Sequence, residues 1–297
     1  LMARQDLVWD RMPHTWGEGT FLGNGRLGLM IYDDREADAL RFDIGSTDAE
    51  DHRPGNGGGL NHARLPIGHF LLHTVGKIRD GSTFRLDLWQ AETRGEIRTS
   101  RGTISLRAYV HAVDDAIVIE ATPSAGERGF RWEWVGEQAD SPRQTFGIVT
   151  HEAARIDPHY VSNPAGRLGK AGDVTTWNQP LLVGGGTVTA WREQTGREQT
   201  GTTRRLIVSV AHSFPDTGAE AVAVANVRTV SGIPADRLIA SHRAWWHGWY
   251  PQSFLSLSDT RMESFYWIQM YKLASATRSN LKLIDDQGPW LQLTPWP

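Results

Sequence analysis

Apolar and polar residues alternate with a period of two along much of the chain, from about residue 5 to residue 232. Residues 103–110 alternate in this way, Asp114 and Asp115 follow, and residues 116–121 form a more apolar strand pattern. This arrangement predicts a β-hairpin, because one arm is half-buried, the other is buried, and Asp side chains favour the turn between them. Comparable strand patterns occupy residues 26–32, 39–44, 69–75, 84–89, 130–135, 187–191 and 205–212.

Glycine and proline separate these strand patterns, most densely in residues 54–59. Strands that follow one another without helices between them favour an antiparallel sandwich over a parallel sheet. The number of strand patterns predicts that the sandwich is large. The sequence therefore predicts a mainly β fold over residues 1–232.

After Gly232 the apolar spacing changes from two residues to three or four. Pro234 suits the first turn of a helix, and Leu238, His242, Trp245 and Trp249 follow on one face. This predicts a helix that ends at Pro251, because proline interrupts helical hydrogen bonding.

A second helix is predicted from Asp259, which is a favourable N-cap residue. One broad stripe of this helix is expected to be buried. It consists of Met262, Phe265, Tyr266, Gln269, Met270, Leu273 and Ala276. Two such helices cannot cover their aromatic faces on each other alone, so they are expected to pack against the sheet or against a further domain.

The composition narrows the classes of function. The chain has 297 residues, a formal net charge of −3 and no cysteine. The absence of cysteine excludes disulfides, thiol nucleophiles and thiolate metal sites. The near-neutral charge removes the basic footprint of a nucleic-acid binder, and no apolar window approaches the 18 residues of a membrane span.

Tryptophan is abundant, with 13 residues, six of which follow Pro234. Aromatic faces stack on sugar rings, but tryptophan is also the largest core residue. The four tryptophans in the predicted helices are expected to serve packing: Trp245, Trp246, Trp249 and Trp267. Trp290 and Trp296 lie in a non-helical stretch, where a role in binding is more plausible.

Two loop regions contain candidate binding residues. Residues 16–28 place Glu18 and Asn24 among glycines, which either permits a close approach to a ligand or simply forms a turn before a strand. Residues 46–53 contain Asp51 and His52 in a polar loop that could bind sugar hydroxyls, bind a cation or remain solvated.

Signatures of metal or cofactor sites are not found in the sequence. The acidic loop lacks the spacing of an EF-hand, and His69 and His73 would share a strand face without a third ligand in register. Neither a phosphate-binding loop nor a Gly-x-Ser-x-Gly nucleophile motif occurs. No metal and no cofactor are therefore expected.

Several segments together resemble a known family: residues 23–28, 48–53, 64–68, 242–246, 265–272 and 288–290. They are similar to the N-terminal region of glycoside hydrolase family 95, which contains α-L-fucosidases and α-L-galactosidases. The similarity extends over nearly all of the chain and points to an uncharacterised branch near that family.

The resemblance implies an N-terminal β-supersandwich of the galactose-mutarotase type, a helical linker and an (α/α)6 catalytic barrel. It implies a supersandwich at residues 1–232, a linker at residues 233–280 and, at residues 281–297, a segment that enters the barrel. The catalytic residues of the family lie in the barrel, so no catalytic residue is carried over to this chain. The chain is accordingly expected to be a truncated, inactive part of an inverting glycoside hydrolase.

The resemblance also implies that the chain supports the barrel and contributes to the rim of a pocket for α-linked sugars. Glu18, Asn24, Asp51, His52 and Trp290 are the candidate substrate-binding residues. The implied partners are a carbohydrate substrate and the barrel of the same polypeptide, with neither nucleic acid nor membrane, and the implied location is extracellular or periplasmic. Two alternatives remain open: a free-standing carbohydrate-binding module without catalysis, and a purely structural sandwich.

Overall fold

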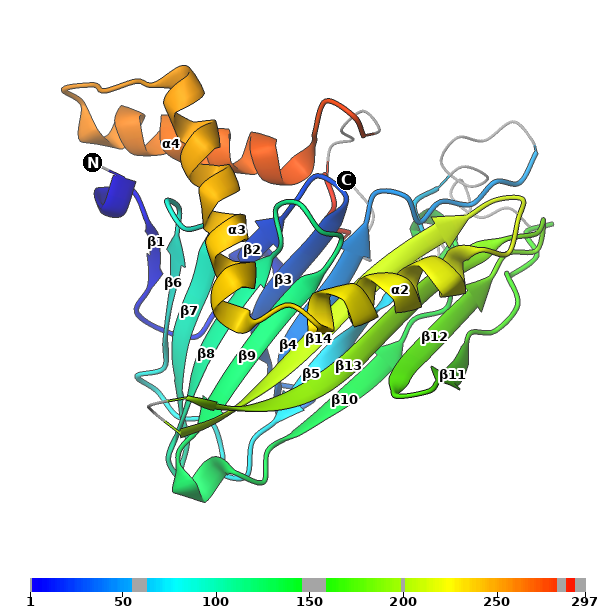
Figure 1. Ribbon diagram of the computed structural model, residues 1–297, viewed down its shortest axis with the longest axis horizontal. Helices are drawn as coiled ribbons and strands as arrows, with labels where there is room; N and C mark the ends of the chain where they lie inside the picture. The colour runs from blue at the N-terminus through cyan, green and yellow to red at the C-terminus, as the bar shows by residue number, and fades with distance from the viewer. Residues whose placement is uncertain (1, 55–62, 146–158, 199–200, 282–286, 292–297) are drawn as a thin grey trace.

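Two antiparallel β-sheets are stacked face to face, and helices cover one outer face and one end (Figure 1). A computed structural model describes residues 2–54, 63–145, 159–198, 201–281 and 287–291. The larger sheet has nine strands in the order β1(Leu7–Trp9), β6(Thr83–Asp87), β7(Glu92–Arg98), β8(Thr103–Val110), β9(Ile117–Pro123), β14(Gly201–Ser213), β13(Gly186–Glu198), β12(Val174–Pro180) and β11(Arg167–Ala171). The smaller sheet has five strands in the order β10(Arg131–Gly136), β5(Gly68–His73), β4(Ala39–Ser46), β3(Leu27–Asp34) and β2(Thr20–Gly23).

The main core lies between the two sheets and follows from the period-two alternation. On β3, β4 and β5, alternate residues such as Ile31, Phe42 and Phe70 are fully buried against the larger sheet. Their neighbours on the same strands point to the other face of the small sheet. The prediction of a mainly antiparallel β fold with a C-terminal helical segment is confirmed.

The structure contains elements that the sequence patterns did not indicate. Strands β1, β2, β7, β11 and β12 are short, polar or rich in glycine. Helix α2(Ala219–Ser231) lies within the range that was expected to be entirely β. It covers the outer face of the nine-stranded sheet and buries Val224, Val227 and Val230 there in a second core. Alanine and valine alternate in this helix, and such a segment fits a strand pattern as well as a helical one, so the sequence pattern does not distinguish the two.

Helices α3(Ala235–Trp249) and α4(Thr260–Ala276) lie across one end of the sandwich (Figure 1). Trp246 of α3 and Trp267 and Tyr271 of α4 are fully buried in the main core. The Tyr271 hydroxyl donates a hydrogen bond of 2.9 Å to the carbonyl oxygen of Phe21 on β2. The helices therefore use the sheets to cover their aromatic side chains.

No helix in the described part of the chain is long and apolar enough to span a membrane.

The buried face of α4 differs from the one that the sequence pattern predicted. Met262, Phe265 and Leu273 are 53%, 59% and 47% exposed. Trp267 and Tyr271 are fully buried instead. Of the predicted stripe, Ala276 is buried, and Tyr266 and Met270 are partly buried against the main core. Apolar residues surround most of this helix, so periodicity alone could not select a face, and contact with the sandwich decided it. The predicted N-cap is correct, because the Asp259 carboxylate accepts hydrogen bonds from the amides of Arg261 and Met262.

Candidate functional site

A cavity of about 200 Å³ opens on the outer face of the five-stranded sheet. Six of its lining residues are polar or aromatic: Trp16, Tyr32, Arg41, Asp43, His69 and Glu137. The strand register places these groups together. Tyr32 on β3 is paired with Arg41 on β4, and Asp43 on β4 is paired with His69 on β5. Because side chains alternate along a strand, these residues face away from the core that Phe42 and Phe70 occupy.

The polar side chains of the cavity form a connected network. The Asp43 carboxylate accepts a hydrogen bond of 2.7 Å from Nε of Arg41 and one of 3.0 Å from the Tyr32 hydroxyl. Nη2 of Arg41 lies 3.9 Å from Oε1 of Glu137, and Nδ1 of His69 lies 3.3 Å from the same oxygen. Two carboxyl groups, one guanidinium and one imidazole therefore line one small space.

The environment moves the pKa values of the two carboxyl groups in opposite directions. Burial raises the pKa of Asp43 above its ordinary value, and the Arg41 charge opposes this shift only in part. The neighbouring His69 imidazole lowers the pKa of Glu137. The two carboxyl groups that share this cavity therefore differ in their tendency to ionise.

A short C-terminal segment forms one wall of this cavity. Leu291 lines the cavity, and Pro289 lies over a row of glycines on the small sheet, Gly23, Gly28 and Gly45. A Cβ atom on Gly28 would approach the Pro289 carbonyl oxygen to 2.7 Å. The glycines in residues 23–28 thus permit a close approach, as the sequence suggested, and the group that approaches is the chain itself.

Of the predicted binding residues, Trp290 directly precedes a residue that lines the cavity, Leu291. Its indole Nε1 donates a hydrogen bond of 2.8 Å to the Leu22 carbonyl oxygen, and its ring meets the Phe21 ring edge to face. The indole is therefore seated on β2.

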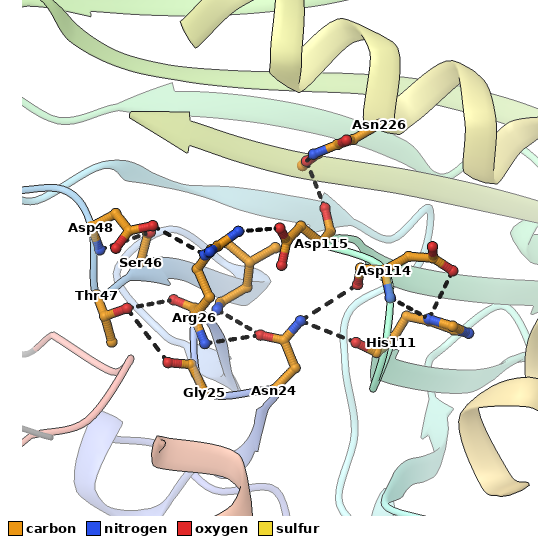
Figure 2. A network of polar contacts seen from close by, with 12 residues as sticks. Asn24, Gly25, Arg26, Ser46, Thr47, Asp48, His111, Asp114, Asp115 and Asn226 are labelled. Carbon is orange, nitrogen blue, oxygen red and sulfur yellow. Dashed lines mark hydrogen bonds and ion pairs between the residues drawn. The ribbon is translucent and has the colours of Figure 1, made fainter. Parts of the chain in front are cut away.

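Asn24 connects the two sheets (Figure 2). Its side-chain oxygen accepts hydrogen bonds from the backbone amides of Arg26 and Leu27, at 3.0 and 2.8 Å. Its side-chain nitrogen donates to the carbonyl oxygens of His111 and Asp114 at the β8–β9 turn. Both ends of the amide are thus engaged with the backbone of this chain.

Arg26 makes a second connection at the same place (Figure 2). Its guanidinium forms ion pairs with Asp48, at 3.1 Å, and with Asp115. Burial raises the pKa of Asp115 while the Arg26 charge lowers it. The polar loop after β4 is thereby held against the turn of the large sheet.

Asp51 and His52 lie on the same loop but make different contacts. Asp51 is fully buried and forms an ion pair of 2.8 Å with Arg53. Nε2 of His52 lies 2.8 Å from Nε2 of His212 on β14, and the His52 ring stacks on Phe214 with ring centres 4.2 Å apart. None of these residues lines the 200 Å³ cavity.

Glu18 lies apart from the other predicted residues, next to the N-terminal strand. Its carboxylate accepts a hydrogen bond of 3.1 Å from the His14 amide and pairs with Arg11 at 3.3 Å. Its neighbour Trp16, however, lines the cavity. The five predicted residues therefore do not converge on one site.

The sequence patterns did not indicate that the lining residues form a cavity, although one signal was present. In the strand pattern of residues 39–44, Arg41 and Asp43 occupy the outward positions, which marks a charged outer face. Their connection with Glu137 and Trp16, which are distant in sequence, required the tertiary structure.

Within the described ranges, no group of three or more His, Asp or Glu side chains is arranged to hold a metal ion.

Comparison with known proteins relates this fold to sugar-active enzymes. Neither protein-family models nor curated protein sequences match this chain. Among solved structures, it resembles a protein described as a kojibiose phosphorylase from the human microbiome, with a TM-score of 0.52 and 11% identity over 86% of this chain. The chain therefore shares its fold with part of that protein.

Two further solved structures resemble the chain more distantly. One is a bacterial glucoamylase in complex with acarbose, with a TM-score of 0.45 and 8% identity over 91% of this chain. The other is a family GH92 α-mannosidase from Bacteroides thetaiotaomicron, with a TM-score of 0.39 and 9% identity over 91%. The chain spans only 36%, 44% and 39% of the lengths of these three structures.

Proposed function

We propose that this chain is the N-terminal, non-catalytic portion of a glycoside hydrolase that acts on α-linked sugars. The shared fold with a glycoside-processing enzyme is the observation that carries the proposal. The resemblance of the sequence to glycoside hydrolase family 95 supports the finer assignment to α-L-fucosides or α-L-galactosides. In this proposal the reaction takes place in an (α/α)6 barrel of the same polypeptide, by inversion.

The contribution of this chain is to support the barrel and to complete the rim of the substrate pocket. Trp290 is the first candidate among the predicted rim residues, because the next residue, Leu291, lines a cavity with sugar-compatible chemistry. Glu18 retains an exposed carboxylate and is the second candidate. Asn24, Asp51 and His52 act in this proposal through the loops that they hold in place.

The test uses a longer protein in which this chain is followed by the proposed barrel. Glu18→Ala and Trp290→Ala are expected to lower kcat/KM on an aryl α-L-fucoside or α-L-galactoside by ~10-fold each, which corresponds to the loss of about one good contact. Unchanged kcat/KM in both variants would refute the rim role. Turnover of these substrates by residues 1–297 alone would refute the non-catalytic assignment.

The second candidate function is a free-standing carbohydrate-binding module. The acidic and aromatic cavity on the small sheet favours it, since such a site can bind a sugar without a barrel. The coding sequence after codon 297 separates the two functions. An open reading frame with an Asn-x-Asn motif soon after this point supports the hydrolase, and a stop codon supports the module.

A further inference from the structure

We propose that the cavity on the outer face of the five-stranded sheet binds one neutral sugar unit, using Trp16, Arg41, Asp43, His69 and Glu137. This inference rests on the proposed function and goes beyond it, because it assigns a separate binding site, outside any barrel, to residues of this chain. The ligand class follows from the size, polarity and charge of the cavity.

The size of the cavity limits the ligand to a single ring. Its volume is about 200 Å³. Pockets for larger ligands begin at roughly 300 Å³, so this one fits a monosaccharide or the terminal unit of a glycan. Leu291 and Ile67 contribute apolar wall, and the Trp16 ring provides an aromatic surface for the C–H face of a sugar.

The lining offers both kinds of hydrogen-bonding group that sugar hydroxyls require. Asp43 and Glu137 supply carboxyl oxygens, and Arg41 and His69 supply N–H groups. Hydroxyl groups donate and accept at once, so a polyol can bridge such mixed partners. An apolar ligand would displace solvent from these polar groups without supplying hydrogen-bonding groups of its own, which is costly.

Two buried groups have hydrogen-bonding capacity that the described chain does not use fully. Nε1 of Trp16 is buried and has no hydrogen-bond partner among the described residues. His69 is 94% buried, and its Nδ1 has only the long contact of 3.3 Å to Glu137. A buried donor without a good acceptor is unfavourable, and a ligand hydroxyl in the cavity would satisfy it.

The charges of the lining favour a neutral ligand over an ion. Arg41 forms ion pairs with Asp34, at 3.2 Å, and with Asp43, at 2.7 Å, so its charge is already balanced. An anion in the cavity would face the carboxyl groups of Asp43 and Glu137. A cation would approach the Arg41 guanidinium at the centre of the network.

The test is an NMR titration of the chain that follows the indole N–H resonance of Trp16, assigned with Trp16→Phe. Methyl α-L-fucopyranoside and methyl α-D-galactopyranoside are the sugar probes. Cyclohexanol, acetate and choline are the apolar, anionic and cationic probes. A saturable shift of this resonance is expected with at least one sugar, in the millimolar range, and with none of the other three probes.

The variants Glu137→Gln and Glu133→Gln form a matched pair on neighbouring parts of the same sheet. Glu137→Gln is expected to weaken sugar binding by ~10-fold, because a charged acceptor is replaced by a neutral one. Glu133→Gln removes an exposed carboxylate outside the cavity and is expected to leave binding unchanged. Thermal melting confirms that both variants are folded.

The outcomes separate this inference from the proposed function. No saturable shift with either sugar, or a shift produced by choline, acetate or cyclohexanol instead, would overturn the binding site while glycoside turnover by the longer protein could still hold. Equal weakening by Glu137→Gln and Glu133→Gln would also overturn it. Sugar binding at Trp16 together with an inactive longer protein would support this binding site and refute the proposed hydrolase function.

Discussion

A Cβ atom on Gly28 would lie only 2.7 Å from the carbonyl oxygen of Pro289, 261 positions later in the sequence. A Cβ atom on Gly45, on the neighbouring strand, would come even closer to the same carbonyl oxygen. The absence of side chains at these positions lets the C-terminal segment lie directly on the small sheet. This contact fixes one wall of the candidate sugar cavity, because Leu291 follows immediately.

Gly28→Ala is therefore expected to displace residues 288–290 and to lower the free energy of unfolding by about 1–3 kcal/mol, the usual cost of an overpacked contact. Hydrogen exchange of the Trp290 indole N–H, which donates to the Leu22 carbonyl oxygen, should become faster. The control is Gly17→Ala, since a Cβ at Gly17 meets no atom within 4 Å. Similar exchange rates in both variants would contradict the seating of this segment.

The side chain of Asn24 is expected to stabilise the folded protein. Asn24→Asp keeps the two accepted hydrogen bonds but replaces the donating nitrogen with an oxygen that faces the carbonyls of His111 and Asp114. The loss of one buried and one part-buried hydrogen bond should lower the free energy of unfolding by ~2 kcal/mol in urea denaturation. Asn178→Asp, at a position with one 3.3 Å hydrogen bond, should cost less. An unchanged urea midpoint in Asn24→Asp would favour a direct role in ligand binding instead.

The stability of the protein is expected to fall as the pH decreases below 6.5, because of His242. Burial lowers the pKa of this imidazole to about 3. It is held neutral between the Ala112 amide, which donates to Nδ1, and the Gln90 carbonyl oxygen, which accepts from Nε2. The unfolded chain takes up a proton near pH 6.5 and the folded chain does not, so acid favours unfolding.

The expected loss from His242 is about 2 kcal/mol between neutral pH and pH 5. Urea denaturation at several pH values measures it. His242→Gln should be less stable at pH 7 but should show a weaker pH dependence, and His73→Gln on the small sheet is the matched control. If His242→Gln retains the pH dependence of the natural sequence, another group is responsible.

The two faces of α4 are expected to respond differently to truncation. Trp267→Ala should lower the free energy of unfolding by ~3–5 kcal/mol, because the indole is fully buried in the main core. Phe265→Ala should cost less than about 1 kcal/mol, because that ring is 59% exposed. Urea denaturation distinguishes them. A larger decrease in the free energy of unfolding for Phe265→Ala than for Trp267→Ala would support the buried stripe that the sequence pattern predicted.

Much of the β fold could be predicted from the sequence because its strands alternate clearly. The hairpin of residues 103–121 appears as β8 and β9, and the pattern of residues 39–44 appears within β4. Helix α2 could not be predicted in this way, because alternating alanine and valine fit both periods. Its helical form is stabilised by packing on the outer face of the large sheet.

The sequence by itself determined the alternating strands, the capped helix that begins after Asp259, and the glycines that permit a close backbone approach. These features are local, since they depend on side-chain period, capping and backbone freedom. Only the tertiary structure decided which face of α4 is buried, what approaches the glycines, and that Trp16, Asp43 and Glu137 share one cavity. Strand pairing and the path of the C-terminal segment bring these distant residues together, and no short-range pattern encodes those contacts.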